Sequence, residues 1–497
     1  MEQLFKAIEK RALDFPEKNA LISSDGNRQS ITTNKELFDN INSTASFFEK
    51  EGLNCIGIFM DNCAQWIICD LAAAKLGITL VPIPLFFTRS QIEHLVTSAG
   101  VEAIISQPSI FTVLTNNQPL IIEAAETNLP IENTVVLRIL TEQVALLSSC
   151  IKVTYTSGST GEPKGVCLSA QNIGAVCKGF DMSMGSMAMT NHLCVLPLAT
   201  LLENIAGVYV CLLHGGVVIT EPLAALGFLS NAEFDINKLL EKIKLHQVES
   251  LILLPQMLTL LVHKFNETVS QQCSSLQFIA VGGGKTSKLT LQQANTLGLP
   301  VYEGYGLSEC GSVVSLNLPY QHKVGSVGKA LPHVCIVISE EGEIIVEGQM
   351  MLGYLDELAQ PLTRIYTGDL GYIDEEGYIF VSGRKTTKIV SSFGRNISPE
   401  WVEASLSSSS VISQVAIFGE AKPSLSAVVY SSDNEMDAIS NAIEECNKNL
   451  PDYAQVRHWI KAESPFTPTN NLLTNNGRLK RANIATHYQE KLEALYL

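Results

Sequence analysis

The sequence predicts an α/β protein that combines a large N-terminal domain of mixed sheets with a small, mobile α+β C-terminal domain. The chain has 497 residues, which is more than one hydrophobic core normally supports. From about residue 40 to residue 310, short apolar runs alternate with amphipathic segments of helix length, as in a sheet with crossover helices. After Gly325 the apolar residues alternate instead, and tight turns separate them, which indicates antiparallel sheet.

The expected strands of the first part are uniformly apolar, which is typical of parallel strands that are buried on both faces. We expect these strands within residues 54–60, 78–84, 101–107, 193–199, 215–220, 249–255 and 276–284. Residues 64–77 and 235–247 have the apolar spacing of the helices between them, and residues 1–20 open the chain with an amphipathic helix.

The second part begins with two similar hairpins, residues 339–348 and 374–384, which predict a small antiparallel, barrel-like unit. A short basic segment follows them, and after it come new helices and small strands. This change predicts a large domain of residues 1–383, a hinge at 384–386 and a small lid domain of residues 387–497, which is long enough to fold as one unit.

Composition excludes several classes of protein. The formal net charge is −16, from 50 acidic and 34 basic residues, so the surface should repel nucleic acid and anionic lipid. No apolar run reaches the roughly 18 residues that a membrane span needs, so we expect no stable membrane insertion. The 12 cysteines are scattered singly without metal-site spacing, which favours reduced core residues and a cytoplasmic protein.

The stretch "VTYTSGSTGEPKGVCLS", residues 153–169, carries the strongest local signal. A strand enters a loop of glycines and hydroxyl residues, and "LSAQNIGAVCKGF" then begins a helix. Small residues let backbone N–H groups approach an anion, and Lys164 adds a charge, so we expect a phosphate site rather than a plain surface loop. The spacing differs from that of a Walker loop. The site comprises Thr156, Ser157, Gly158, Ser159, Thr160, Gly161 and Lys164.

Two further stretches carry residues suited to a nucleotide. In "GLPVYEGYGLSECGSVVS", Tyr305 can stack on a base, Ser308 can donate to a phosphate, and Glu309 is a hard oxygen ligand for Mg²⁺. In "IYTGDLGYIDEEGYIFVSGRK", Asp369 can accept hydrogen bonds from ribose hydroxyls, and Arg384 lies at the far end of the hairpin. Taken singly, these residues are equally compatible with packing and turn roles.

In this order and at these separations, the three stretches resemble the AMP-forming acyl-activating superfamily of acyl-CoA synthetases, luciferases and nonribosomal peptide adenylation domains. The resemblance covers nearly the whole chain, and "LPLATLLENIAG" and "GRNISPEWVE" look closer to long-chain acyl-CoA synthetases. It implies that ATP and Mg²⁺ convert a fatty or other apolar carboxylic acid to an acyl-adenylate with release of pyrophosphate. The acyl group would then pass to a thiol, either coenzyme A or the phosphopantetheine of an acyl carrier protein.

The resemblance also implies a role for each motif position. Residues Thr156 to Lys164 would hold the β- and γ-phosphates, and Glu309 would bind Mg²⁺. Gly282, Gly283 and Gly284 would lie against the adenine, and Tyr305, followed by Gly306, would stack on it. Ser308 would contact the α-phosphate, and Asp369 with Arg384 would lie at the ribose. Thr386 would be the hinge residue, and Gly394 with Arg395 would lie on the side of the thiol acceptor.

The chain departs from the superfamily pattern at three of these positions. Thr386 stands where Asp or Lys is usual, and Thr200 stands where acyl-CoA synthetases carry histidine. Arg478 stands where the family has a lysine that contacts the carboxylate and the α-phosphate, and Lys480 follows two positions later. Arginine and lysine are not equivalent at such a site. Either cation could serve, so an adenylate-forming enzyme without a thiol step and a non-catalytic relative both stay open.

Overall fold

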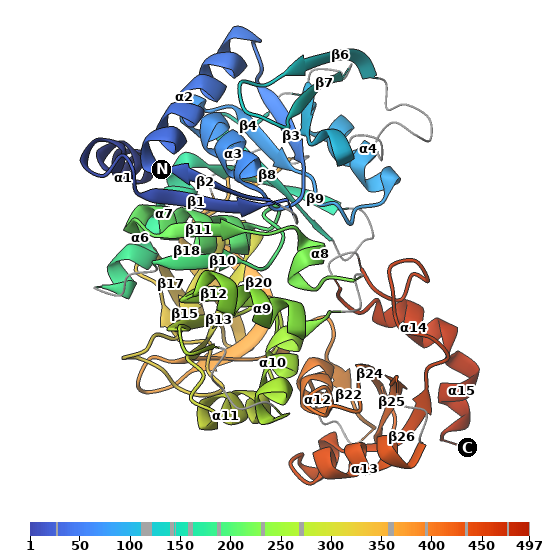
Figure 1. Ribbon diagram of the computed structural model, residues 1–497. Coiled ribbons are helices and arrows are strands. Elements are labelled where there is room, and N and C mark those ends of the chain that lie inside the picture. The colour runs from blue at the N-terminus through green and yellow to red at the C-terminus, as the bar shows by residue number, and fades with distance from the viewer. Residues whose placement is uncertain are drawn as a thin grey trace.

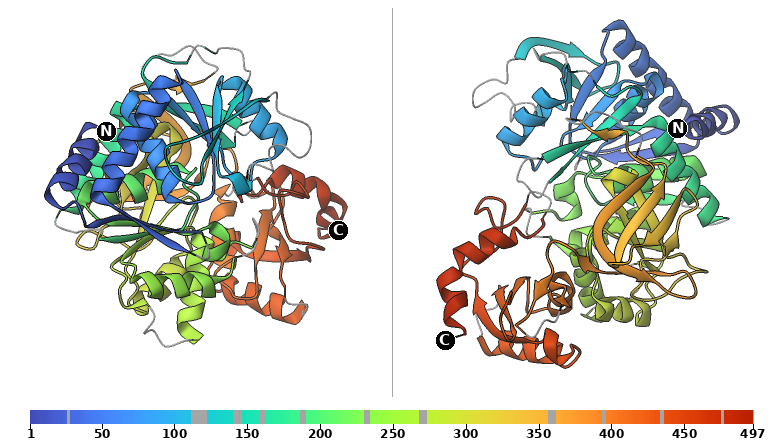
Figure 2. Two further views of the ribbon diagram at one scale, coloured as in Figure 1. Left: turned by 45° about the horizontal axis from the view of Figure 1, so that its top comes forward. Right: turned by 180° about the vertical axis from the view of Figure 1, so that it is seen from behind.

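The computed structural model describes most of the chain. The described residues are 1–25, 28–110, 122–139, 144, 146–157, 163–185, 190–229, 234–267, 273–355, 362–392, 396–432, 436–474 and 477–496. The expected fold class is confirmed, because mixed sheets with crossover helices form the large part and an antiparallel sheet follows them. Figures 1 and 2 show the residues from about 400 onward as a separate, orange-to-red body beside the large part.

An eight-stranded sheet forms the upper part of the molecule in Figure 1, with the strand order β19-β9-β8-β4-β3-β5-β7-β6. Its strands are β3 (Cys55–Phe59), β4 (Thr79–Pro82), β5 (Ala103–Ser106), β6 (Ile122–Asn128), β7 (Val135–Ile139), β8 (Cys150–Ser157), β9 (Pro163–Ser169) and β19 (Gly353–Tyr354). The associated helices are α2 (Asn34–Lys50), α3 (Ala64–Leu76) and α4 (Arg89–Ser98). Each of α2 and α4 begins with a capping box, in which side chains of the first turn accept hydrogen bonds from backbone N–H groups that have no partner within the helix.

A nine-stranded sheet lies against it, with the order β16-β15-β14-β13-β12-β10-β11-β1-β2. Its strands are β1 (Asn19–Ser24), β2 (Gln29–Thr33), β10 (Asn191–Cys194), β11 (Val217–Thr220), β12 (Ser250–Leu253), β13 (Phe278–Val281), β14 (Val301–Leu307), β15 (Ser312–Leu316) and β16 (Lys329–Ala330). Its helices are α1 (Glu2–Asp14), α6 (Ala170–Met184), α7 (Val210–His214), α8 (Leu223–Leu226), α9 (Ile236–His246), α10 (Pro255–Glu267) and α11 (Lys288–Thr296). The hairpin of β1 and β2 had no counterpart among the strands expected from the sequence.

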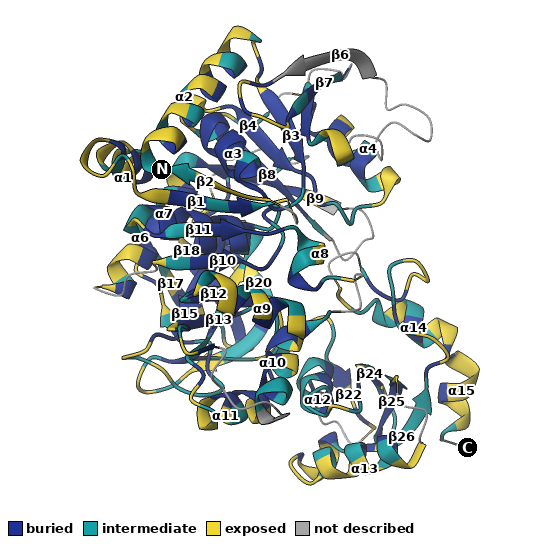
Figure 3. Ribbon diagram, in the orientation of Figure 1, coloured by how far each residue is buried: buried dark blue, intermediate teal, exposed yellow. Residues whose placement is uncertain are grey.

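Helix α3 explains how the two sheets share one core. It is buried on every face and contacts β4 and β8 of one sheet and β1 of the other. A helix that is apolar all round belongs in such an interior, whereas a surface helix carries a polar stripe. Figure 3 shows α3 and the neighbouring strands as buried, while α2 and α11 expose one face.

A π-helix, η1 (Leu202–Tyr209), follows the "LPLAT" segment and continues into α7. The apolar residues at 193–199 predict a strand, but β10 ends at Cys194 and the next residues form a loop. Pro197 lies within that loop and could not donate to a strand ladder. Short π-helical stretches occur frequently at functional sites.

The antiparallel unit is a four-stranded sheet with the order β17-β18-β20-β21. Its strands are β17 (Val334–Ile338), β18 (Glu343–Gly348), β20 (Arg364–Ile373) and β21 (Ile379–Arg384). Both expected hairpins are present, and Gly342 and Gly377 adopt the positive φ that their tight turns require.

The C-terminal part has its own sheet, β24-β25-β26, and its own hydrophobic clusters. Its elements are β22 (Ile389–Val390), β23 (Asn396–Ile397), α12 (Pro399–Leu406), β24 (Gln414–Phe418), β25 (Leu425–Tyr430), α13 (Met436–Asn447), β26 (Val456–Lys461), α14 (Arg481–His487) and α15 (Gln489–Ala494), with a short 3₁₀ turn at Asp452–Ala454. A second 3₁₀ turn, Ser308–Cys310, lies in the large part after β14. The buried cluster of the large part ends at Ile379, and that of the C-terminal part begins at Ile389. The hinge at 384–386 stays a prediction.

Two further expectations concern the surface and the cysteines. Within the described ranges, none of the helices has the length and apolar character needed to span a bilayer.

Ten of the cysteines are buried, Cys335 is exposed, and Cys446 is partly exposed, and all of them are free thiols. Burial raises the pKa of Cys273 and Cys446 to about 11, so these thiols stay protonated at neutral pH.

Candidate active site

The predicted phosphate loop lies at the tip of a hairpin. Strands β8 and β9 pair in antiparallel register, with Thr156 opposite Lys164. The helix expected within "LSAQNIGAVCKGF" is present as α6, which begins at Ala170, but strand β9 lies between the loop and this helix and was not expected. The anion-binding contribution of a helix N-terminus is therefore absent from the flanks of this loop. Gly158, Ser159, Thr160 and Gly161 lie outside the described residues, as does the side chain of Ser157.

Lys164 and Glu309 both contact the same tyrosine, Tyr354. The Lys164 Nζ lies 5.0 Å from the centre of the Tyr354 ring, and the Tyr354 hydroxyl donates to Glu309 Oε1 at 2.9 Å. Tyr354 belongs to β19, which pairs with β9, so the phosphate hairpin and the Glu309 turn are built against the same residue. The sequence did not single out Tyr354, because no motif spacing marks it.

The motif "GYGLSE" forms the end of β14 and the 3₁₀ turn after it. Gly306 is required here, since a Cβ at this position would lie 1.8 Å from the backbone oxygen of Ser312. Ser308 and Glu309 are half-buried at the start of the turn. The arrangement brings Glu309 beside the hairpin of β8 and β9, as the sequence motif predicts for a group near the phosphates.

Three consecutive glycines form the bend at the end of β13. Gly283 has a φ of +79°, which glycine adopts without strain, and a Cβ on Gly282 would lie 3.5 Å from the oxygen of Gly304. The nearest side chains to this bend are apolar, namely those of Leu202, Leu254 and Pro255. The bend therefore carries no side chains of its own, and apolar groups border it.

Tyr305, Asp369 and Arg384 form one connected group. The Tyr305 hydroxyl donates to Asp369 Oδ2 at 2.6 Å, and Arg384 Nε donates to Asp369 Oδ1 at 2.9 Å. Asp369 and Arg384 face each other across β20 and β21, so the register of that hairpin brings them together. Asp369 is only 6% exposed. Burial and the neighbouring Asp369 carboxylate raise the pKa of Tyr305, which keeps its hydroxyl as a donor.

Arg478 reaches this group from the C-terminal part. Burial, and then repulsion from the Arg384 guanidinium, lower the pKa of Arg478, while the Asp369 and Glu309 carboxylates act in the opposite direction. The Arg384, Asp369 and Glu309 charges therefore act on Arg478, although the Arg478 residue as a whole is exposed. A tight turn presents it, in which Gly477 has a φ of +74° and the Arg478 N–H donates to Thr474 Oγ1 at 3.0 Å.

The two cations that follow Arg478 in the sequence have partners within the C-terminal part. The Lys480 ammonium group donates to Asn471 Oδ1. Arg481 is half-buried and forms an ion pair with both oxygens of the buried Glu403. The reason is tertiary, because α12 and α14 bring the two residues together from positions 78 apart in the chain.

The predicted acyl-site residue Thr200 lies in the turn that precedes η1. Its hydroxyl donates to the backbone oxygen of Pro197 at 2.8 Å, and its own backbone oxygen accepts from the Asn204 N–H at 3.0 Å. Thr200 is half-buried. With its proton engaged in this turn, the hydroxyl is an acceptor toward the rest of the site, unlike a protonated histidine.

Three remaining predictions fall elsewhere. Thr386 is exposed in the segment between β21 and β22, next to Thr387, whose hydroxyl donates to Glu400 at 2.5 Å. Gly394 and Arg395 lie outside the described residues.

Glu303 is a buried carboxyl on β14 that the sequence analysis did not identify. Burial raises the pKa of Glu303 to about 7. The alternation of residues along a strand gives no signal for a buried charge, so no sequence pattern marks this residue.

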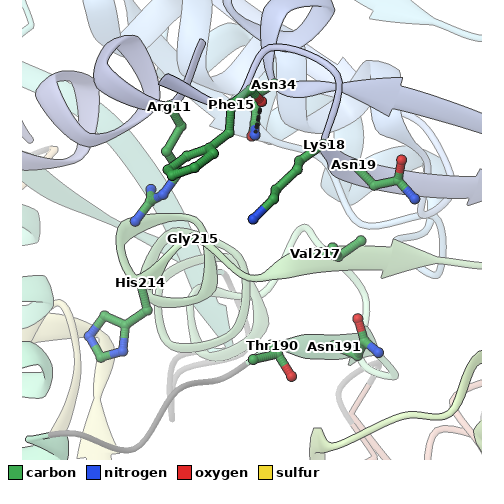
Figure 4. Close-up of a pocket in the computed structure, with 10 residues that line it drawn as sticks. All are labelled: Arg11, Phe15, Lys18, Asn19, Asn34, Thr190, Asn191, His214, Gly215 and Val217. Atoms are coloured by element: carbon green, nitrogen blue, oxygen red, sulfur yellow. Dashed lines mark hydrogen bonds between the residues drawn. The ribbon is translucent and has the colours of Figure 1, made fainter. Parts of the chain in front are cut away.

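A cavity of about 640 Å³ lies apart from this site, at the amino ends of β1, β10 and β11 (Figure 4). Arg11, Lys18 and His214 contribute to its lining. The Arg11 guanidinium donates to the backbone oxygen of Leu213 at 2.8 Å and so closes the end of α7. The candidate site lies at the opposite edge of that sheet, where the carboxyl ends of β13 and β14 meet, which is where open α/β sheets bind ligands.

The donor set of the candidate site fits a magnesium ion. Mg²⁺ in nucleotide enzymes is held by one or two carboxylates together with phosphate oxygens of the substrate. Glu309 offers one such carboxylate, beside the hairpin whose loop carries hydroxyls. The whole cluster can therefore hold a nucleotide, with a ring at the glycines, a ribose at Asp369 and phosphates between Lys164 and Arg478.

Comparison with known proteins agrees with this geometry. The family described as AMP-binding enzyme matches residues 8–355, and the AMP-binding enzyme C-terminal domain matches residues 387–497. A 2-succinylbenzoate–CoA ligase of Bacillus pumilus is 27% identical over 436 residues, covering 82% of this chain and 83% of the relative. A long-chain-fatty-acid–CoA ligase of Mycobacterium bovis is 29% identical over 230 residues, covering 40% and 38%.

A solved structure extends the likeness to the whole fold. The o-succinylbenzoate CoA synthetase of Bacillus subtilis, in complex with its acyl-adenylate intermediate, superimposes with a TM-score of 0.75 at 23% identity. The match covers 96% of this chain and 97% of that structure. Both parts of the chain therefore have the architecture of that protein.

Proposed function

The chain belongs to the AMP-binding enzyme family, and from that premise we propose that it is an AMP-forming acid–CoA ligase for a carboxylic acid with an apolar body. In the first half-reaction the carboxylate attacks the α-phosphate of ATP, an acyl–phosphate bond forms, and pyrophosphate leaves. In the second, the CoA thiol loses its proton and attacks the acyl carbonyl, a thioester forms, and AMP leaves.

One observation carries the proposal. Tyr305, Asp369 and Arg384 form a bonded group on the large part, and Arg478 of the C-terminal part lies within electrostatic range of it and of Glu309. Four charged side chains from separate segments converge where the sequence motifs place the ribose and the phosphates. Reactions at phosphorus depend on positioning and charge stabilisation, so they need no nucleophilic side chain.

Each residue then has a defined task. Asp369 accepts the ribose hydroxyls, Tyr305 covers the adenine, and Ser308 donates to the α-phosphate. Arg478 holds the carboxylate and the α-phosphate together through its planar, fork-shaped donors. Glu309 would hold Mg²⁺, which when bound neutralises charge on the phosphate oxygens. Lys164 faces the departing pyrophosphate as a point charge.

Arg478 fits the reaching role better than Lys480. The charges that act on Arg478 are Arg384, Asp369 and Glu309, whereas Lys480 donates to Asn471 inside the C-terminal part. To reach the nucleotide, Lys480 would have to leave that partner. Arginine is longer than lysine and its charge is spread over a plane, so we expect a different rate rather than a different reaction.

The apolar character of the acid is supported by Leu202, which opens the helix that follows Thr200, the residue predicted for the acyl site. The relatives named above act on an aromatic acid and on fatty acids, respectively, so we propose a substrate with an apolar aromatic or aliphatic body. CoA is the proposed acceptor, because both relatives are CoA ligases.

The test is ATP–pyrophosphate exchange across a panel of acids, with benzoate, 2-succinylbenzoate, octanoate and palmitate as its core. The best acid is then assayed for thioester formation with CoA and with a phosphopantetheine carrier protein. Exchange followed by acyl-CoA supports the proposal. Exchange without any thioester would instead identify an adenylate-forming enzyme with another acceptor, and no exchange with any acid would identify a catalytically inactive relative.

A further inference from the structure

The helix that follows Thr200 is held from two sides by consecutive buried residues. Glu203 Oε1 lies 2.9 Å from His192 Nε2, and Glu203 Oε2 accepts from the Leu196 N–H at 2.8 Å. These partners belong to β10 and the loop after it, in the nine-stranded sheet. The next residue, Asn204, makes its contacts with the eight-stranded sheet and with α3.

The contacts of Asn204 belong to a closed network of four buried residues. Asp70 of α3 and Lys152 of β8 form an ion pair at 2.8 Å, and both side chains are 1% exposed. Asn204 Nδ2 donates to Asp70 Oδ2 at 2.8 Å, while its oxygen accepts from Lys152. The Tyr209 hydroxyl donates to Asp70 Oδ2 at 2.6 Å and accepts from Lys152 at 3.1 Å.

This network connects two parts of the proposed site. Lys152 precedes Thr156 by four residues on β8, so the two side chains share a face about 13 Å apart, at about 3.3 Å of rise per residue. Asn204 bonds through its backbone to Thr200. The base of the phosphate hairpin is therefore tied by charged hydrogen bonds to the turn that holds Thr200, deep inside the elements that Figure 3 shows as buried.

Stability alone is a weak reason for such a pair. Removing two charges from water costs several kcal/mol per ion, and apolar residues of similar volume often replace buried ion pairs without loss of stability. What apolar contacts do not provide is direction, since they allow small shifts of a helix along a sheet. Charge-assisted hydrogen bonds are short and directional, so they fix where η1 lies relative to β8.

We propose that Asp70, Lys152, Asn204 and Tyr209 are positioning residues that hold the Thr200 turn at a fixed place relative to the phosphate hairpin. If the proposed function holds, these four residues align the carboxylate of the acid with the α-phosphate of ATP. Such alignment matters, because a shift of about 1 Å at a reacting centre can cost about a hundredfold in rate.

The test compares wild-type enzyme with the double variant Asp70→Asn/Lys152→Met, which removes both charges and the hydrogen bonds that Lys152 donates but keeps the approximate side-chain volumes. We expect kcat for pyrophosphate exchange to fall more than about tenfold and KM for ATP to change less than about threefold. The control is Glu51→Gln/Arg138→Met, which removes an ion pair that touches neither η1 nor β8; both constants should stay within about twofold. Unchanged exchange in a folded Asp70→Asn/Lys152→Met enzyme would overturn the proposal.

A second readout does not depend on turnover of any acid. In hydrogen exchange, AMP binding to wild type should slow amides of residues 200–209 as well as those of β8, whereas in the double variant only β8 should be slowed. Equal protection of both segments in both proteins would refute the coupling. If the double variant does not fold, Tyr209→Phe removes one hydroxyl of the network and should show the same pattern more weakly. An acid panel without exchange would refute the function but leave this test intact.

Discussion

The Tyr305 hydroxyl donates a hydrogen bond of 2.6 Å to Asp369, and Arg384 donates to the other oxygen of the same carboxylate at 2.9 Å. One buried carboxylate thus fixes the residue proposed to cover the adenine and the residue proposed to lie near the ribose. We expect Asp369→Asn to raise KM for ATP by about tenfold or more, because hydrogen bonds to a charged group are worth about 1.5–3 kcal/mol. Asp374→Asn, a few residues further along the chain, is the control. If Asp374→Asn raised KM for ATP as much as Asp369→Asn does, the assignment of Asp369 to the ribose would be contradicted.

Arg478 and Lys480 should differ in their effect on adenylation. We expect Arg478→Ala to reduce pyrophosphate exchange by more than about tenfold and Lys480→Ala by less than about threefold. The reason is that Arg478 lies among the charges of the site, whereas Lys480 is held by Asn471. Arg478→Lys keeps the charge and should lose less than Arg478→Ala, although its rate should differ from that of wild type. A larger loss for Lys480→Ala than for Arg478→Ala would reverse the assignment.

Glu309 should control the dependence on magnesium. Glu309→Gln keeps the size of the side chain and its contact with Tyr354 but removes the charge that a hard cation requires. We expect the Mg²⁺ concentration for half-maximal exchange to rise about tenfold or more. Tyr354→Phe removes only the hydrogen bond and is the matched control. An unchanged magnesium requirement in Glu309→Gln would place the metal elsewhere.

Glu303 should make the stability of the protein depend on pH. Burial raises its pKa from 4.5 to about 7 in the folded state. The folded protein therefore holds this proton more tightly, so its contribution to stability is complete below pH 4.5 and is lost as pH rises through 7. Relative to Glu303→Gln, the free energy of unfolding of wild type should fall by about 3 kcal/mol between pH 4.5 and pH 8. Urea denaturation at both pH values measures it, and parallel pH profiles would disprove it.

The Arg481–Glu403 pair should stabilise the C-terminal part. Arg481→Ala leaves a buried carboxylate without its cation, and we expect a loss of about 3 kcal/mol or more in the free energy of unfolding. Arg481→Met/Glu403→Leu removes both charges and should recover most of that loss. Lys491→Ala breaks an exposed pair with Glu463 and should change nothing measurable. Chemical denaturation monitored at Trp459 reports on all three, and equal losses in the single and double variants would count against the pair.

Much of the fold could be predicted because local patterns encode it. Uniformly apolar runs became β3, β4, β5, β12 and β13, and the two acidic-glycine hairpins became the antiparallel unit. The predictions failed where a strand is interrupted or where a motif masks it. The strand expected over residues 193–199 ends at Cys194, and the second half of the predicted phosphate loop forms strand β9 ahead of the expected helix.

The sequence by itself determined the chemistry of the candidate residues, since carboxylates, hydroxyls, glycines and cations at motif spacing are properties of the chain. Only the tertiary structure decided which of them meet. It joined Asp369 to Arg384 through strand register, brought Arg478 within electrostatic range of them while Lys480 donates to Asn471, and paired Arg481 with Glu403. It also buried Lys152 beside Asp70, 82 positions earlier in the chain. Contacts between distant segments depend on how whole sheets and helices pack, and no local spacing carries that information.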